Sequence, residues 1–458
     1  MKKYSTLFVK KFSHCFAATI LYFFFFHNFL SAASPVVYVA NQNSSNVSVI
    51  DTVTNTVIAT IPVGTDPFNM AITPDEAHIY VANGSIIETA TNTVTETVSV
   101  GSSSYLEVTP NGAQVYFVNS VVDDVTAIDT ATNTVTATIP VGSFPFTLAI
   151  TPNSLATYVI NVFSDNVSAI NTASNTVIAT IPVGSSPTFA VISPNSTHVY
   201  VINPNSDNVS VISTASNTVI ATVPVGDVPV HLAVTPNGSY VYVVNQSSNN
   251  ISVIDTASNT VTATISIGIT PRFIVIAQDG TRAYVTNISS ADVSVIETAS
   301  NTVTATVPVG ASSANLAITS DGTRVYVVNQ ASNNISVIDT ATNTVIATVA
   351  VGSFPIDLII KEIFIPPPPP PPLLIITSNV EKARGFGIRF TYYKLSWNAI
   401  AEATSYHIFR NGILLAKDIH STHYSDTAID PAEIYTYVVT AYASGTSIVS
   451  GQLQIGSL

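Results

Sequence analysis

The chain repeats one short pattern eight times, and this periodicity constrains its fold more than any other feature. A tyrosine, a hydrophobic residue, any residue and an asparagine recur in that order. The intervals between the tyrosines are 42 residues, then 36, then 42 five times. Repeats of this length form solenoids, propellers or arrays of small units. The repeated tyrosines are Tyr38, Tyr80, Tyr116, Tyr158, Tyr200, Tyr242, Tyr284 and Tyr326.

Each full repeat predicts four short strands, as residues 227–268 illustrate. Segments rich in Val, Ile, Thr and Tyr lie at 231–234, 240–244, 251–254 and 260–267, and such residues favour a pleated surface. Pro236 and Gly238 fall in the first connection, where they favour a turn. Proline cannot donate to a strand ladder, so its recurrence in the fourth strand predicts that this strand is the outer edge of the sheet. These prolines are Pro62, Pro140, Pro182, Pro224 and Pro308.

The ends of the repeat region predict a closed ring. Residues 36–64 supply only the last three strands of a repeat, seven full modules follow, and one strand-like segment remains at 355–360. That segment has the pattern needed to complete the first sheet. We therefore expect an all-β, eight-bladed β-propeller of four-stranded antiparallel blades. The second module is shorter, but its Asn83-Gly84 pair favours a tight hairpin. A seven-bladed ring with one displaced module is the alternative.

The repeat also resembles a known family. Residues 38–41 (YVAN), 47–52 (VSVIDT) and 57–64 (VIATIPVG) are similar to the YVTN-family β-propeller repeat, and the similarity recurs over residues 36–360. The resemblance implies an exported or cell-surface propeller, often within a multi-domain chain. Relatives include surface-layer proteins, binding scaffolds and cofactor-dependent enzymes, and one relative binds single-stranded DNA. The resemblance therefore implies a fold and little about chemistry.

The two ends of the chain predict further segments. Residues 1–33 combine four lysines with an apolar run and a small-x-small ending, which is typical of a signal peptide. A retained membrane anchor is the alternative, although about 20 apolar residues are needed to cross a bilayer. We expect the propeller at residues 34–362 and a polyproline linker at 363–372. Cys15 is the only cysteine, so a cleaved chain has no disulfide.

The C-terminal segment, residues 373–458, resembles a fibronectin type III domain. Leu395-Ser396-Trp397, residues 406–412 and residues 435–441 carry the similarity. The resemblance implies a small β-sandwich, with Trp397 in its core and Tyr435 at a tyrosine corner. No Arg-Gly-Asp tripeptide is present to support integrin-type adhesion.

Charge and motif content exclude several functions. Residues 35–365 carry 21 acidic side chains and four basic ones, a formal charge of −17, which argues against a nucleic-acid partner. No Gly-x-Ser-x-Gly, His-Glu-x-x-His or phosphate-binding glycine motif occurs. Asp123-Asp124 and the recurring aspartates between the third and fourth strands fit solvated turns, and His420-x-x-His423 is a weak metal candidate. We therefore expect no catalytic residue, no metal and no cofactor.

The best candidate site consists of positions that vary while the repeat stays fixed. One such position follows the connection between the fourth strand of one blade and the first strand of the next, and in a propeller it rings one mouth of the central channel. Glu107 and Arg272 are neighbouring outliers. We expect these residues to bind a small ligand or peptide. The candidates are Asn69, Tyr105, Glu107, Thr147, Phe189, His231, Arg272, Phe273, Asn315 and Asp357.

These observations favour an exported, periplasmic, cell-surface or secreted protein without enzymatic activity. Its partner would be a protein, a peptide or a small ligand at the propeller face, and no segment after the leader predicts a membrane span. Two alternatives remain open. One is a propeller enzyme, either a hydrolase or a cofactor-linked oxidoreductase, and the other is a surface-layer structural subunit. Fold alone does not decide among them.

Overall fold

The computed structural model describes residues 35–101, 103–362 and, with short gaps, 376–455. These residues form two compact units, 35–362 and 376–455. Every regular element among them is a β-strand. No helix in this part of the chain is long and apolar enough to span a membrane. The predicted signal peptide and the predicted polyproline linker lie outside the described residues, so both stay predictions.

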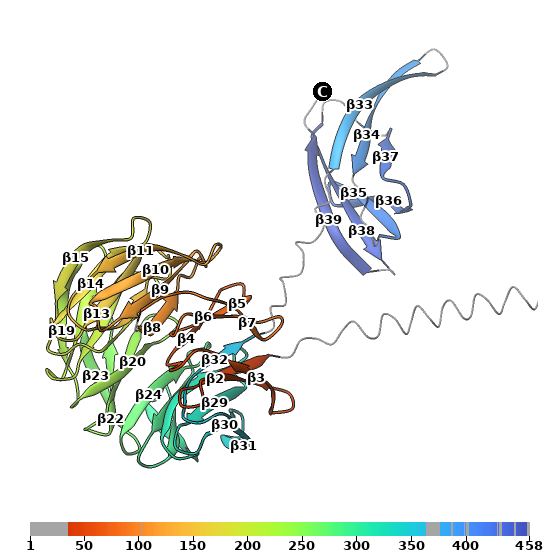
Figure 1. Ribbon diagram of the computed structural model, residues 1–458. Coiled ribbons are helices and arrows are strands. Elements are labelled where there is room, and N and C mark those ends of the chain that lie inside the picture. The colour runs from red at the N-terminus through yellow and green to blue at the C-terminus, as the bar shows by residue number, and fades with distance from the viewer. Residues whose placement is uncertain are drawn as a thin grey trace, which may run out of the picture. The chain divides into compact units, whose positions relative to one another are not determined.

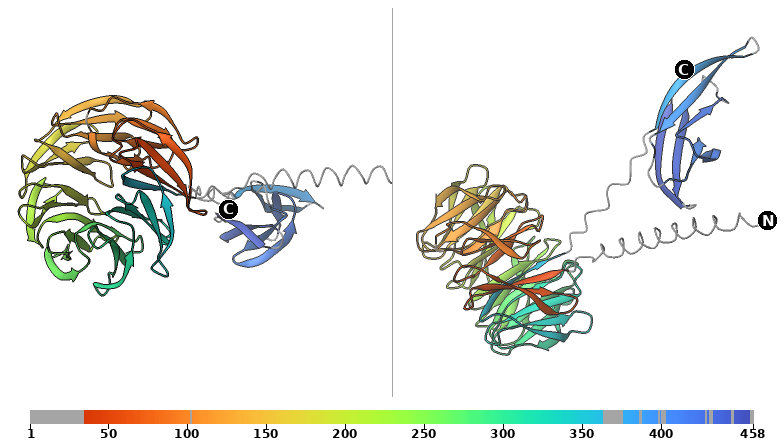
Figure 2. Two further views of the ribbon diagram at one scale, coloured as in Figure 1. Left: turned by 60° about the horizontal axis from the view of Figure 1, so that its bottom comes forward. Right: turned by 45° about the vertical axis from the view of Figure 1, so that its right-hand side comes forward.

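The first unit contains eight four-stranded antiparallel sheets arranged in a ring (Figures 1 and 2). The left view of Figure 2 shows the sheets following one another around a common centre. This confirms the predicted eight-bladed propeller and excludes the seven-bladed alternative. The short second module forms a complete blade, and Gly84 at its tight hairpin has a φ of 86°.

Within each blade the strands lie in chain order from the centre of the ring outward. The first blade is the exception, because its inner strand is the last strand of the propeller. The inner strands are β32 (Pro355–Lys361), β4 (Met70–Ile72), β8 (Ser103–Val108), β12 (Pro145–Ile150), β16 (Phe189–Ile192), β20 (Pro229–Val234), β24 (Pro271–Ile276) and β28 (Ser313–Ile318). The second strands are β1 (Val36–Asn41), β5 (His78–Val81), β9 (Gln114–Asn119), β13 (Ala156–Asn161), β17 (His198–Asn203), β21 (Tyr240–Asn245), β25 (Arg282–Asn287) and β29 (Arg324–Asn329).

The third strands are β2 (Asn46–Asp51), β6 (Ser85–Glu88), β10 (Asp124–Asp129), β14 (Asn166–Asn171), β18 (Asn208–Ser213), β22 (Asn250–Asp255), β26 (Asp292–Glu297) and β30 (Asn334–Asp339). The outer strands are β3 (Thr56–Pro62), β7 (Thr93–Thr97), β11 (Thr134–Pro140), β15 (Thr176–Pro182), β19 (Thr218–Pro224), β23 (Thr260–Ser266), β27 (Thr302–Pro308) and β31 (Thr344–Ala350). The repeated prolines end outer strands, as predicted, because the outer edge needs no donor there.

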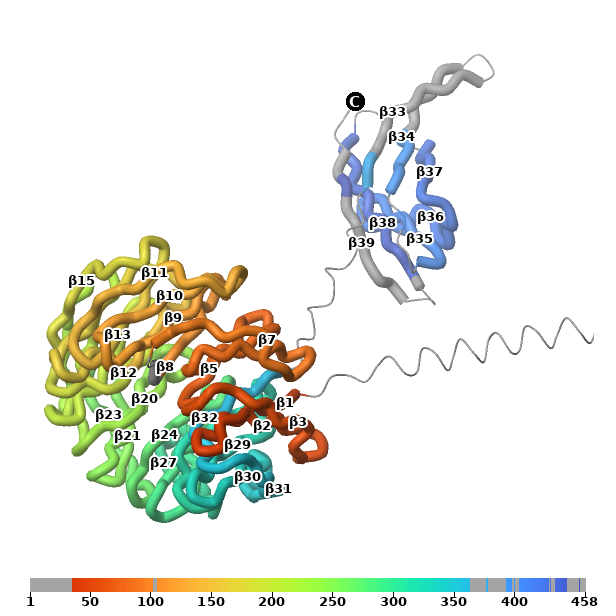
Figure 3. Tube along the Cα trace, viewed as in Figure 1, coloured from red at the N-terminus to blue at the C-terminus, as the bar shows by residue number. Residues whose placement is uncertain are grey.

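The ring closes through strand β32. It pairs antiparallel with β1, and Val39 lies opposite Leu358 while Ala40 lies opposite Asp357. Figure 3 shows β1, at the red end of the first unit, beside β32. The first blade thus joins the two ends of the propeller in one sheet, as the sequence predicts.

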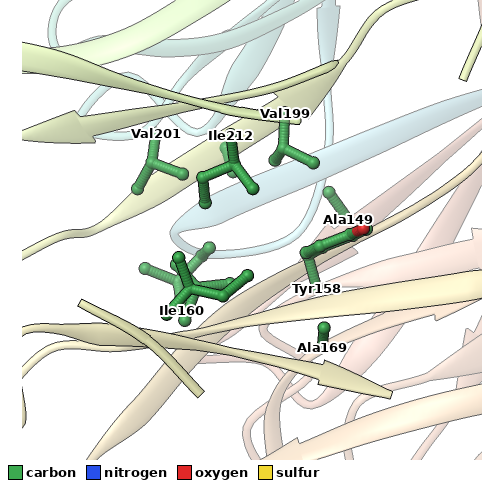
Figure 4. Packing of buried hydrophobic residues seen from close by; sticks show 10 residues of the cluster. Ala149, Tyr158, Ile160, Ala169, Val199, Val201 and Ile212 are labelled. Atoms are coloured by element: carbon green, nitrogen blue, oxygen red, sulfur yellow. The ribbon is translucent and has the colours of Figure 1, made fainter. Parts of the chain in front are cut away.

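Burial explains why the blades need so many Val and Ile residues. The second and third strands are buried along almost their whole length, because each blade packs its two faces against its neighbours. Between the fourth and fifth blades, Tyr158 and Ile160 pack with Val199, Val201 and Ile212 (Figure 4). Burial of this kind is the main favourable term in folding. It also explains a positive mean hydropathy of +0.41 in a chain of strands.

The repeated tyrosine joins neighbouring blades. The Tyr158 hydroxyl donates to Asn217 Oδ1 of the next blade at 2.8 Å, and Asn217 has a φ of 51°. Asparagine tolerates this left-handed conformation, which explains its recurrence in the turn before the outer strand. The same bond joins Tyr38 to Asn92, Tyr80 to Asn133, Tyr116 to Asn175 and Tyr242 to Asn301.

The glycine that follows each outer strand allows a close approach. A Cβ atom on Gly226 would lie 2.8 Å from the side chain of Asn245, the buried asparagine of the repeat. Asn245 in turn donates to Asn250 Oδ1 and Ser252 Oγ within its own blade. The glycine and the asparagine therefore recur together because one makes room for the other.

The second unit contains two small antiparallel sheets. Trp397 is 6% exposed, and Tyr437 is fully buried and donates to Asp426 at 2.7 Å. Asp426 also accepts from Arg410 at 2.7 Å. The resemblance to a fibronectin type III domain stays a prediction. One sheet has the order β33 (Ile376–Gly385), β34 (Ile388–Trp397), β37 (His423–Asp426), and the other β36 (Ile413–Ile419), β35 (Ser405–Arg410), β38 (Tyr435–Ala443), β39 (Thr446–Ile455).

Candidate functional site

The eight varying positions occupy equivalent places near the start of the inner strands. Tyr105 lies opposite Val118, and His231 lies opposite Val244, one residue before the buried asparagine in each second strand. We call these eight residues the mouth ring. In blade order they are Asp357, Asn69, Tyr105, Thr147, Phe189, His231, Phe273 and Asn315.

Two overlapping hollows lie at the mouth ring. The first has a volume of about 310 Å³ and the second about 510 Å³, which are ordinary sizes for small-molecule sites. Every mouth-ring residue and Arg272 line at least one of them. Both hollows are lined by Phe68, Tyr105, Phe189, Arg272 and Phe273.

Sequence reasoning missed part of the lining. Phe68 and Phe146 directly precede mouth-ring residues, and Gln246 and Gln330 directly follow the buried asparagines. Both positions vary among the blades in the same way as the mouth ring does. A comparison of the repeats that also included the residue before each mouth-ring position and the residue after each buried asparagine would have found these four side chains.

One side of the mouth ring is hydrogen-bonded, and Asp357 is its centre. The Asp357 carboxylate, 7% exposed, accepts from Asn69 Nδ2 at 3.1 Å, the Met70 N–H at 2.8 Å and Asn315 Nδ2 at 2.8 Å. Asn69 Oδ1 accepts from the Leu106 N–H at 3.0 Å, which extends the chain of bonds to the third blade. We call Asn315, Asp357 and Asn69 the polar half of the ring. It connects four blades where the ring closes.

The other side of the mouth ring is aromatic. The imidazole of His231 stacks on Phe189 with ring centroids 4.3 Å apart and lies 3.8 Å from the Phe273 centroid. His231 is 8% exposed, and neither ring nitrogen has a hydrogen-bond partner in the described chain. Burial lowers the pKa of His231 to about 3, so the imidazole is neutral at physiological pH. We call Phe189, His231 and Phe273 the aromatic half.

Tyr105 and Thr147 separate the two halves. Thr147 Oγ1 donates to the Thr188 carbonyl of the next blade at 2.9 Å. Burial raises the pKa of Tyr105 well above its usual value, and the nearby carboxyl groups of Glu107 and Asp357 add to this effect. Tyr105 is therefore a neutral phenol at the mouth.

Two carboxyl groups near the mouth hold protons unusually tightly. Burial raises the pKa of Glu107 to about 8, although the bond from the Ile150 N–H to Glu107 Oε2 at 3.1 Å opposes the shift. Burial raises the pKa of Asp357 to about 7, against the lowering effect of its hydrogen bonds. Glu107 lines neither hollow, since it lies two residues farther along β8 than Tyr105.

The other polar candidates from the sequence serve local structure. Asp123 accepts from the Phe144 N–H at 2.7 Å, and Asp124 accepts from Asn119 at 2.6 Å. In the second unit, His420 Nδ1 lies 2.8 Å from the Thr404 carbonyl. Among the residues that the structure describes, no three His, Cys, Asp or Glu side chains gather as a metal site.

Comparisons with known proteins support the fold. Residues 182–361 match the model of the YNCE-like beta-propeller family. Comparison with curated proteins finds no match.

Solved structures with similar architecture come from different organisms. Kuenenia stuttgartiensis hydrazine synthase matches with 22% sequence identity and a TM-score of 0.50, over 60% of this chain and 96% of that chain. A functionally unknown protein from Desulfotomaculum acetoxidans DSM 771 matches with 18% identity and a TM-score of 0.51, over 72% of this chain and 99% of that chain. Likenesses at this level of identity show a shared fold and leave function open.

Proposed function

We propose that this chain is an exported binding protein without enzymatic activity, which takes a small ligand at the mouth of its propeller channel. The observation that carries the proposal is the aromatic half of the mouth ring, which lies beside a hollow of about 510 Å³. Concave sites lined by aromatic side chains and a few polar groups are the usual form of small-molecule sites. Export is proposed from the leader-like sequence of residues 1–33.

The state of the carboxyl groups supports binding over catalysis. General acid–base catalysis needs a carboxyl group within reach of a bound substrate. Asp357 is occupied by hydrogen bonds that connect blades, and Glu107 lines neither hollow. The side chains left to contact a ligand are chiefly aromatic rings, amides and Arg272.

Ligand-observed NMR on the full chain tests the proposal. The wild-type protein is mixed with small fragments grouped as anionic aromatic, neutral aromatic, cationic and carbohydrate compounds, and saturation transfer to each is recorded. We expect transfer to at least one group, and we expect Phe273→Ala to abolish it. Phe163→Ala is the matched control, because Phe163 is 71% exposed and lines neither hollow.

Two outcomes would overturn the proposed function. One is the absence of transfer to any fragment, and the other is undiminished transfer in Phe273→Ala. Thermal unfolding of both variants establishes that they are folded when they are compared.

A further inference from the structure

Among the arginine and lysine side chains of residues 35–362, Arg272 lies at the mouth and differs from the others in its lack of a protein partner. Arg282 and Arg324 each donate to a backbone carbonyl of the neighbouring blade, and Lys361 interacts electrostatically with Glu76. Arg272 is exposed and, within residues 35–362, makes no hydrogen bond or ion pair. A lone guanidinium beside a hollow, in a segment that carries few cations, is available to an anionic group.

The backbone at the aromatic half offers donors as well. An inner strand is the edge of its sheet, so alternate N–H groups point away from the neighbouring strand. The N–H groups of Met70 and Leu106 donate to side chains of the polar half. The equivalent N–H groups of Ala190 and Leu232, which directly follow Phe189 and His231, have no side-chain acceptor in the described part of the chain. Hydrogen-bond donors therefore remain available to a ligand on this side of the ring.

The aromatic half also has an unsatisfied imidazole. His231 is more than nine-tenths buried and lines the larger hollow, yet neither of its ring nitrogens is bonded. A buried polar group without a partner costs free energy. The neutral ring can donate through one nitrogen and accept through the other, so contact with a ligand would recover part of that cost.

The aromatic side chains in the lining favour a ligand with a planar ring. Phe189 and Phe273 flank the His231 imidazole, and each phenylalanine lines the two hollows. Aromatic side chains stack on planar rings in offset or edge-to-face arrangements. Arginine is the side chain best matched to a carboxylate, because its guanidinium can donate two parallel hydrogen bonds.

We propose that the mouth binds a small aromatic carboxylate, whose ring lies against Phe189 and Phe273 and whose carboxylate pairs with Arg272. This inference rests on the proposed function and specifies its ligand class. An aromatic acid and the C-terminal carboxylate of a peptide ending in an aromatic residue share this chemistry. A cationic ligand would instead need a free carboxylate, and Asp357 is already saturated by donors.

Isothermal titration calorimetry of the full chain with two probes tests the inference. The probes are 2-naphthoate, which carries the charge, and 2-naphthamide, which has the same rings without it. We expect Arg272→Gln to weaken naphthoate binding about tenfold, the effect of losing one partly exposed charge-assisted pair, and to leave naphthamide binding within about twofold. Arg282→Gln is the matched control, since it removes the same charge from the same blade and lies outside both hollows.

Further titrations with the dipeptide glycyl-phenylalanine and with its C-terminal amide distinguish a free aromatic acid from a peptide C-terminus as the ligand. Tighter binding of the dipeptide acid than of naphthoate assigns the site to peptide C-termini, and the reverse assigns it to free aromatic acids. Both results support the proposed chemistry.

Failure of this inference differs from failure of the proposed function. Equal affinity for naphthoate and naphthamide, or no effect of Arg272→Gln, would overturn the anionic ligand class and leave a binding mouth. If neither probe binds while other fragments give transfer that Phe273→Ala abolishes, the ligand class is again wrong and the proposed function stands. If no fragment binds at all, both are wrong.

Discussion

The polar half and the aromatic half of the mouth ring occupy equivalent positions in blades of the same architecture, yet their side chains are bonded differently. In the polar half, Asp357 accepts three hydrogen bonds from the second and eighth blades. In the aromatic half, His231 lies between two phenylalanines with both nitrogens unbonded. One side of the ring has satisfied its polar groups within the protein, and the other has not.

In a repeat protein, the hydrogen-bonding state of equivalent polar side chains separates structural positions from candidate functional ones. A fully bonded position contributes to stability and needs no ligand to explain it. A buried polar group without a partner is destabilising by itself, and such features concentrate at functional sites. The comparison therefore assigns closure of the ring to Asp357 and supports the proposal that a ligand contacts the neighbourhood of His231.

The largest effect is expected from Asp357→Ala. The substitution leaves the buried Met70 N–H and the half-buried amides of Asn69 and Asn315 without this acceptor, and we expect the free energy of unfolding to fall by about 3 kcal/mol. Chemical denaturation of the full chain measures the change. Asp255→Ala, at an exposed turn, is the control and should cause a much smaller loss. Equal losses in both variants would contradict the closure role of Asp357.

A dependence on pH is expected next. An unfolded glutamate has a pKa of about 4.3, whereas that of Glu107 is about 8 in the folded state. Between these values the folded chain holds a proton that the unfolded chain releases, so stability falls as pH rises. Asp357 acts in the same direction up to about pH 7.

Thermal unfolding at pH 5, 7 and 9 measures this dependence. Wild type should lose stability between pH 5 and about pH 8, and Glu107→Gln, which keeps an acceptor for the Ile150 N–H, should lose less over this interval. Identical slopes in the two proteins would show that Glu107 does not hold the proton.

The aromatic half should respond in the opposite direction to the polar half. His231→Phe keeps an aromatic ring in the stack and removes two unbonded nitrogens, so we expect the free energy of unfolding to rise by about 1 kcal/mol. The same variant should bind 2-naphthoate more weakly in calorimetry. His198→Phe, where the ring nitrogen contacts Thr197, should bring no such gain. A destabilised His231→Phe protein would remove the contrast between the two halves.

The smallest effect is expected at the boundary between the halves. Thr147→Val removes one hydrogen bond to the Thr188 carbonyl without changing the shape of the side chain, and should cost about 1 kcal/mol. Thr157→Val is the matched control, because the fully buried Thr157 hydroxyl has no partner in the described residues. Denaturation curves should show a loss for the first variant and none for the second. A loss in both would mean that packing, and not the bond between blades, decides the result.

Much of the fold could be predicted because each blade repeats the same short pattern of turn and strand residues. The turn asparagines, the edge prolines and the alternation of strands are fixed by backbone preferences over a few residues. The closing strand was predictable because residues 355–360 match the strand that the first blade lacks. The shared bond between Tyr158 and Asn217 was missed, since it joins residues of two different blades.

The candidate site was predictable in position but not in arrangement. Comparison of the repeats placed one variable residue per blade near the channel. It did not indicate that Asn69 and Asp357, 288 residues apart, share a hydrogen bond, or that Glu107 lines neither hollow.

The amino-acid sequence by itself determined the strands, their order in each blade and the number of blades, because these follow from local propensity and from a pattern repeated eight times. Only the tertiary structure decided which mouth residues are bonded to one another and which are left without partners. The physical reason is that a hydrogen bond between blades depends on how the closed ring brings distant residues together. No short stretch of the chain contains that information.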